Sequence, residues 1–131
     1  MIIITFGTFD LFHVGHLKII QRIKEKYEES KVVVGVSTDK LNLEKKGKIP
    51  VVHESQRLEI IRNIKGVDEV FYEESLEKKL EYCQKYNASV LVMGDDHIGR
   101  FDYLEAWDID VIYFSRTENI STSIILESIQ N

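Results

Sequence analysis

Apolar runs of strand length alternate with amphipathic helical patterns along the chain. Five runs are expected to be strands, at residues 2–6, 32–36, 69–72, 90–93 and 111–114. The last four are rich in β-branched and aromatic residues, which is typical of buried parallel strands. Apolar residues spaced three or four positions apart predict helices near residues 14–27, 55–65, 76–86, 103–107 and 121–129. This alternation predicts an α/β fold, a doubly wound, Rossmann-like parallel sheet of five strands with helices on both faces.

Polar segments directly follow four of the five predicted strands. They are residues 7–16, 37–39, 94–96 and 115–117. Ligands of doubly wound sheets bind at the carboxyl ends of the strands, near the topological switch point. We therefore expect the four segments to converge on one active site. Residues 38–54 show neither the helical nor the strand pattern of apolar residues. An irregular stretch of this length inside a compact domain predicts a functional loop.

Length and composition predict one domain spanning residues 1–131, long enough to bury roughly two-thirds of the surface of the unfolded chain. No run approaches the ~20 apolar residues of a membrane span, and no basic segment precedes an apolar one at the start. We expect a cytoplasmic protein with no membrane insertion.

The net charge of -5 argues against nucleic-acid binding. Cys83 is the only cysteine, which excludes an internal disulfide.

The first polar segment, Gly7-Thr8-Phe9-Asp10-Leu11-Phe12-His13-Val14-Gly15-His16, joins the first predicted strand to the first predicted helix. His13 and His16 are three residues apart and therefore lie one turn apart at the start of that helix. Unpaired backbone N–H groups and the helix dipole favour bound phosphate there. Two imidazoles can donate hydrogen bonds to phosphate oxygens as charge builds during transfer. Gly7 and Gly15 allow the chain to approach a ligand closely.

This segment resembles the signature of the cytidylyltransferases, within the nucleotidyltransferase superfamily. A second block, Arg116-Thr117-Glu118-Asn119-Ile120-Ser121-Thr122-Ser123, resembles the R-T-E-G-I-S-T-T block of that family, with asparagine in place of its glycine. Three further segments are similar to the bacterial glycerol-3-phosphate cytidylyltransferases, at residues 67–70, 92–96 and 99–102. The resemblance extends over nearly the whole chain.

The resemblance implies transfer of CMP from CTP to a small phosphorylated alcohol, most closely glycerol 3-phosphate, giving a CDP-alcohol for cell-surface polymer or lipid assembly and pyrophosphate. It implies a homodimer and Mg²⁺ held mainly by the phosphates, with Asp10 as either a metal ligand or an anchor of the turn. It assigns catalysis to His13, His16 and Arg116. The expected CTP-binding residues are Gly7, Thr8, Phe9, Asp10, Gly15, Asp39, Gly94, Asp96, Thr117, Ile120, Ser121 and Thr122.

The acceptor side departs from the glycerol-3-phosphate group. Lys65 stands where that group has arginine, and Leu76 where it has tryptophan. Lysine does not reproduce a bidentate arginine clamp on phosphate. The expected acceptor-binding residues are Lys45, Lys46, Lys48, Arg57 and Lys65.

Alternatives to glycerol 3-phosphate therefore stay open. The same CTP chemistry fits phosphocholine, phosphoethanolamine, a polyol phosphate or a phosphorylated amino-acid derivative. A second alternative is an adenylyltransferase that uses ATP. A third is a non-catalytic nucleotide-sensing domain, which the presence of both His13 and His16 disfavours.

Overall fold

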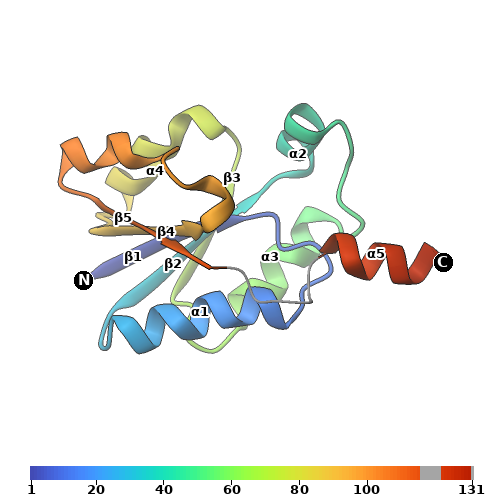
Figure 1. The fold of residues 1–131 in the computed structure, drawn as a ribbon, viewed down its shortest axis with the longest axis horizontal. Coiled ribbons are helices and arrows are strands. Elements are labelled where there is room, and N and C mark those ends of the chain that lie inside the picture. Colours follow the sequence, from blue (N-terminus) through green and yellow to red (C-terminus); the bar gives the residue numbers. More distant parts are fainter. Residues whose placement is uncertain (116–121, 131) are drawn as a thin grey trace.

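A computed structural model describes residues 1–115 and 122–130. Its five strands form one all-parallel sheet in the order β3-β2-β1-β4-β5 (Figure 1). The strands are β1 (Ile2–Gly7), β2 (Lys31–Ser37), β3 (Glu69–Glu73), β4 (Val90–Gly94) and β5 (Asp110–Phe114). The predicted fold class is confirmed, and each strand lies within one residue of its predicted bounds at both ends.

Helices cover both faces of the sheet (Figure 1). On one face lie α1 (Val14–Lys26) and α3 (Glu54–Arg62), whose Ile23 and Ile61 are fully buried with one set of strand residues. On the other face the 3-10 helix η1 (Leu76–Lys78) leads into α4 (Lys79–Lys85), and Cys83 packs there with Leu104 of the 3-10 helix η3 (Asp102–Trp107). The 3-10 helix η2 (Asp95–His97) follows β4, and α5 (Thr122–Gln130) comes last.

Residues 38–54 are not a long irregular loop, contrary to the prediction, because they begin with the helix α2 (Asp39–Lys46). The Thr38 hydroxyl accepts the Leu41 N–H at 3.1 Å and caps its start, and Gly47 ends it with a left-handed φ of 75°. Only Leu41 and Asn42 of this helix are buried. An eight-residue helix with two buried positions shows little hydrophobic periodicity, which explains why the pattern missed it.

The order of the strands places a topological switch point between β1 and β4. The chain runs outward from β1 to β2 and β3, then crosses back to β4 on the other side of β1. The carboxyl ends of β1 and β4 therefore border the crevice in which ligands of such sheets bind. Among residues 1–115 and 122–130, no helix is long and apolar enough to cross a membrane.

Candidate active site

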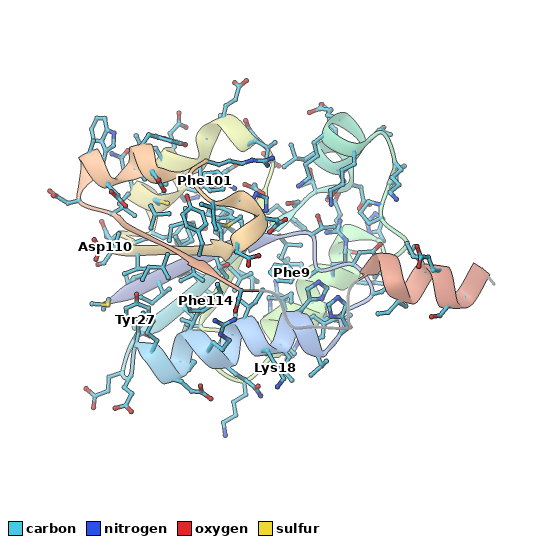
Figure 2. The ribbon with its side chains drawn as sticks, in the orientation of Figure 1. Phe9, Lys18, Tyr27, Phe101, Asp110 and Phe114 are labelled. Atoms are coloured by element: carbon cyan, nitrogen blue, oxygen red, sulfur yellow. The ribbon has the colours of Figure 1, made fainter. Side chains whose placement is uncertain are left out.

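The segment from Gly7 to His16, called here the histidine turn, leaves β1 at this switch point in an unusual backbone conformation. Phe9 and Leu11 have φ values of 55° and 48°, which are rare for residues other than glycine. The Phe9 ring is buried and folds back over Gly7, where an added Cβ would lie 2.9 Å from the ring (Figure 2). Gly7 is therefore required by the packing of Phe9, a role the sequence did not indicate.

The two histidines cap the helix that they begin. His13 is the N-cap of α1, and its Nδ1 accepts the Gly15 N–H at 3.0 Å. His16 reaches back, and its Nδ1 accepts the His13 N–H at 3.3 Å. The two rings are stacked with centroids 3.8 Å apart, and Phe9 packs edge-on against His16. This is a capping box built from histidines, and it fixes the orientation of both rings.

Burial favours the neutral form of both imidazoles. Burial lowers the pKa of His13 below its usual 6.5. Burial and the neighbouring His13 lower the pKa of His16 to about 4, against the opposing charge of Asp10. Since each Nδ1 accepts a backbone N–H, each neutral ring carries its proton on Nε2. Each ring thus has one N–H donor left for a ligand.

The segment after β4 lies across the switch point from the histidine turn. Gly94 leads into η2, and Asp96 is exposed there with its carboxylate 3.5 Å from the His97 Nε2. A Cβ on Gly94 would lie 2.7 Å from the Asp96 carboxylate, so another residue here would require the Asp96 side chain to rotate away. The structure thus brings Gly94 and Asp96 to the expected edge of the sheet.

Several predicted site residues lie outside the described residues. They are Arg116, Thr117, Ile120 and Ser121. Thr122 begins α5, as the pattern indicated to within one residue. Just before this block, the Arg22 guanidinium donates to the Ser115 carbonyl at 2.8 Å, which fixes the end of β5 against α1.

Thr8 and Asp10 make contacts within the protein that the sequence did not reveal. The Thr8 hydroxyl donates to the amide oxygen of the fully buried Asn42 at 2.8 Å. The Asp10 carboxylate accepts the N–H groups of Val51 at 2.8 Å and Val52 at 2.9 Å, and that of Leu11 at 3.1 Å. Both side chains thus join the histidine turn to the chain around α2 and α3.

Asp39 and Arg57 bond to each other and to backbone groups within the protein. Arg57 is 1% exposed, and its guanidinium donates to the carbonyls of Thr8, Ser37 and Val52 and to the Asp39 carboxylate at 2.6 Å. Asp39 also accepts the Glu54 N–H at 3.4 Å, while Glu54 accepts the Asp39 N–H at 2.8 Å. In this arrangement the Arg57 guanidinium and the Asp39 carboxylate are directed at groups within the protein, and their contacts with acceptor and nucleotide stay predictions.

The four predicted acceptor lysines fall at two ends of the molecule. Lys45 and Lys46 end α2, and Lys48 follows Gly47, so all three lie on the carboxyl side of the sheet. The Lys45 ammonium lies 3.5 Å from the Ser37 hydroxyl, and partial burial and Lys46 lower its pKa. Lys65, by contrast, lies beyond α3, just before β3 begins, and is exposed at the amino end of the sheet. Within one chain, Lys65 does not join the site.

The sequence reading missed a buried ion pair beside Lys45. Glu73 ends β3 and Lys79 begins α4; both are 1% exposed, and the ammonium donates to the carboxylate. Glu73 also accepts the Ser37 hydroxyl at 2.9 Å, and the Lys79 ammonium lies 3.9 Å from the centre of the Phe6 ring. Burial lowers the pKa of Lys79 despite the attraction of Glu73. The sequence signal for Glu73 was that it directly follows the predicted strand at residues 69–72, where ligand-binding residues of such sheets are found.

The described side chains do not form a ligand set for a divalent metal. Within residues 1–115 and 122–130, no three His, Cys, Asp or Glu side chains are grouped to hold one. Asp10, the expected candidate, directs both carboxylate oxygens at backbone N–H groups. The described carboxylate and imidazole side chains alone would therefore not complete the coordination of a metal at this site.

Comparisons with known proteins agree with this geometry. The model of the family described as "Cytidylyltransferase-like" matches residues 4–128. A glycerol-3-phosphate cytidylyltransferase of Bacillus subtilis is 43% identical over 97% of this chain and 95% of its own length. The Staphylococcus aureus enzyme of the same name is 37% identical over 97% of this chain and 93% of its own.

A solved structure shares the fold at much lower sequence identity. The crystal structure of a lipopolysaccharide core biosynthesis protein from Thermoplasma volcanium superposes with a TM-score of 0.73 and 21% identity, covering 90% of this chain and 98% of that one. The family model spans almost the whole sheet, including the histidine turn and the segment after β4. The chain therefore belongs to the cytidylyltransferase-like family.

Proposed function

We propose that this enzyme transfers CMP from CTP to glycerol 3-phosphate, giving CDP-glycerol and pyrophosphate. The observation that carries the proposal is the pair of neutral histidines at the start of α1, each with an Nε2–H left for a ligand at the switch point. Relatives named for this reaction are 37% and 43% identical over nearly the full chain. Phosphate binding at such a helix start is expected on physical grounds.

The reaction needs in-line displacement at the α-phosphorus. A phosphate oxygen of the acceptor forms the new P–O bond while the bond to the β-phosphate bridging oxygen breaks, and that oxygen leaves on pyrophosphate. His13 and His16 donate Nε2–H groups to the phosphate oxygens as negative charge shifts between them. Neutral rings suit this role, since they donate without any need to lose or gain a proton during transfer.

The acceptor phosphate is proposed to bind at the exposed Lys45 ammonium, which lies beside the Ser37 hydroxyl. The buried Lys79 is bonded to Glu73, so it is proposed to act on the acceptor through its charge and not by direct contact. The two ammonium groups outnumber the one carboxylate and leave positive charge that attracts a phosphate. This location replaces the Arg57 and Lys65 part of the sequence-based acceptor site. Lys46 and Lys48 are proposed to add attraction from the neighbouring surface.

We propose Mg²⁺ as the metal, entering bound to the triphosphate, where it would neutralise charge on the β- and γ-phosphates. On the nucleotide side, the proposed contacts are the histidine turn, including Thr8 and Gly15, and the segment after β4, including Gly94 and Asp96. The predicted block from Arg116 to Thr122 is proposed to bind the triphosphate as well. The protein is proposed to be a single domain that acts in the cytoplasm as a homodimer. Light scattering at working concentration tests the homodimer by measuring the molecular mass in solution.

The decisive experiment measures pyrophosphate release with purified protein, Mg²⁺ and each pair of nucleotide and acceptor. CTP with glycerol 3-phosphate is expected to give the highest kcat/KM. ATP in place of CTP is expected to give little product. A higher kcat/KM with phosphocholine, phosphoethanolamine or a polyol phosphate would replace the acceptor but keep the CTP chemistry. If the protein binds nucleotide but releases pyrophosphate from none of the mixtures, the proposal that it is an enzyme is contradicted.

A further inference from the structure

Both backbone polar groups of Val52 are hydrogen-bonded to charged side chains, those of Asp10 and Arg57. Its N–H donates to the Asp10 carboxylate at 2.9 Å, and its carbonyl accepts from the Arg57 Nε at 2.9 Å. The preceding Val51 N–H donates to the other Asp10 oxygen at 2.8 Å, although the Val51 side chain is 63% exposed. The backbone at this point is therefore fixed by two charged groups rather than by apolar packing.

The same two charged groups come from the two elements that residues 47–53 contact, the histidine turn and α3. Asp10 lies three residues before His13 in the histidine turn. Arg57 lies in α3, and its NH1 group also donates to the carbonyls of Thr8 and Ser37, both at 2.7 Å. Residues 47–53, which connect α2 to α3 and carry Lys48, are thus bonded directly to the segment that carries the catalytic histidines.

We infer that Asp10 is a positioning residue, which holds residues 47–53 against the histidine turn and so sets the acceptor side relative to the nucleotide side. This inference rests on the proposed function for its kinetic consequence. Transfer needs the acceptor oxygen close to and in line with the α-phosphorus, and small misplacements of reacting groups are costly. Two N–H groups of residues 47–53 on one carboxylate fix the distance between this segment and the histidine turn more tightly than one would.

The alternative role for Asp10 is direct ligation of the metal, and the hydrogen bonds distinguish the two. In Asp10→Asn, the amide oxygen can keep the bonds to Leu11 and Val52, but the amide NH2 then faces the Val51 N–H. A donor facing a donor makes no hydrogen bond. A loss confined to Val51 is thus specific to the positioning role.

Amide hydrogen exchange of the substrate-free protein tests this directly. In the unmodified protein, the Val51 and Val52 amides should be protected although they lie between helices. Asp10→Asn should lower protection of Val51 about 10- to 100-fold, the scale of a hydrogen bond to a charged group, and leave Val52 protected. Asp10→Ala should lower both. Unchanged protection in Asp10→Ala would overturn the inference, and the result does not depend on which acceptor the enzyme uses.

Kinetics supply the second readout, with Asp68→Ala as the matched control. The Asp68 carboxylate also accepts one backbone N–H, that of Val32 at 2.7 Å, but at the amino end of the sheet. Asp10→Ala should lower kcat with CTP and glycerol 3-phosphate about 10- to 100-fold without changing the Mg²⁺ concentration needed for half-maximal rate. Asp68→Ala should leave kcat unchanged. Equal losses in both variants, or a raised Mg²⁺ requirement with protection retained, would overturn the inference.

If the unmodified protein releases no pyrophosphate from CTP and glycerol 3-phosphate, the proposed function fails on its own. The exchange of Val51 and Val52 would still decide whether Asp10 holds this part of the chain. If the unmodified protein turns over CTP and glycerol 3-phosphate, but Asp10→Asn leaves the Val51 amide as protected from hydrogen exchange as before, the positioning role fails while the proposed function stands.

Discussion

The two halves of the site are built in different ways. In the histidine turn, each ring bonds a backbone N–H two or three residues away, so the arrangement is local. On the acceptor side, Ser37, Glu73 and Lys79 come from β2, β3 and α4, and the Ser37 and Glu73 side chains that meet are 36 residues apart in sequence.

This difference has energetic consequences. Local bonds at a helix start can be lost with little effect on the rest of the fold, because an N-cap contributes about 1 kcal/mol. A buried ion pair is different, because removing one partner leaves an uncompensated charge and costs about 3–5 kcal/mol. Substitutions of His13 and His16 should therefore affect chemistry more than stability, and those at Lys79 should affect both.

The largest loss of turnover is expected from the histidines. His13→Ala or His16→Ala should lower kcat by ~10²–10³-fold, since each removes one donor to the transferring phosphate. Steady-state pyrophosphate release measures this, with circular dichroism to verify the fold. His13→Ser is the matched control, because serine is a good N-cap whose short side chain does not reach the position of Nε2. If His13→Ser has normal kcat, the role of His13 is only to cap the helix.

Lys79→Met is expected to raise the acceptor KM strongly and to destabilise the fold by about 3–5 kcal/mol, because Glu73 is left buried without its cation. Urea unfolding and acceptor titration measure the two effects. The double variant Lys79→Met with Glu73→Gln removes the unpaired charge and should regain most of the stability. It should not regain acceptor affinity. Recovery of both would show that Lys79 is only structural.

A smaller effect is expected from the exposed lysines. Lys45→Ala should raise the acceptor KM several-fold, about what one partly exposed charged hydrogen bond contributes, with the KM for CTP unchanged. Lys46→Ala and Lys48→Ala should have less effect. Lys31→Ala, at the amino end of β2, is the control for net charge. Equal changes in all four variants would indicate a general electrostatic effect rather than a site.

The smallest expected effect is on the pH dependence of stability. The pKa of His16 is about 4 in the folded protein and about 6.5 when unfolded, so between these values the unfolded chain binds more protons. The free energy of unfolding should fall by about 2 kcal/mol as the pH drops from 6.5 to 4, a value reduced by partial exposure. Urea unfolding at several pH values measures it. His16→Asn should flatten this slope, and an unchanged slope would assign it to other groups.

The same contrast explains what could be predicted from sequence. Strand runs, the helix start at Val14 and the placing of His13 and His16 depend on neighbouring residues, and their places in the fold are confirmed. Arg57 was assigned by charge and position in the chain and Lys65 by its place in the family resemblance, and neither carries information on burial or on which end of a helix faces the site. The α2 helix was missed because it buries too few residues to produce a pattern.

Long-range partners were also beyond reach. Nothing near Asp10 in the sequence marks Val51 and Val52 as its partners, since backbone N–H groups are the same in every residue except proline. Glu73 and Lys79 look like ordinary surface charges in a stretch rich in both signs. Such contacts become visible only when the sheet brings the ends of β1, β2 and β3 together.

The left-handed backbone of Phe9 and Leu11 has a consequence for engineering this protein. Each such residue costs of the order of 1–3 kcal/mol, which the surrounding packing must offset. Phe9→Gly would relax the backbone but would also remove the ring that packs on His16. Because loss of the buried Phe9 ring costs about 3–5 kcal/mol, more than the strain, searches for more thermostable variants are expected to select glycine or asparagine only at the half-buried Leu11, and to lose activity in doing so. Screens for stability alone would weaken this active site first.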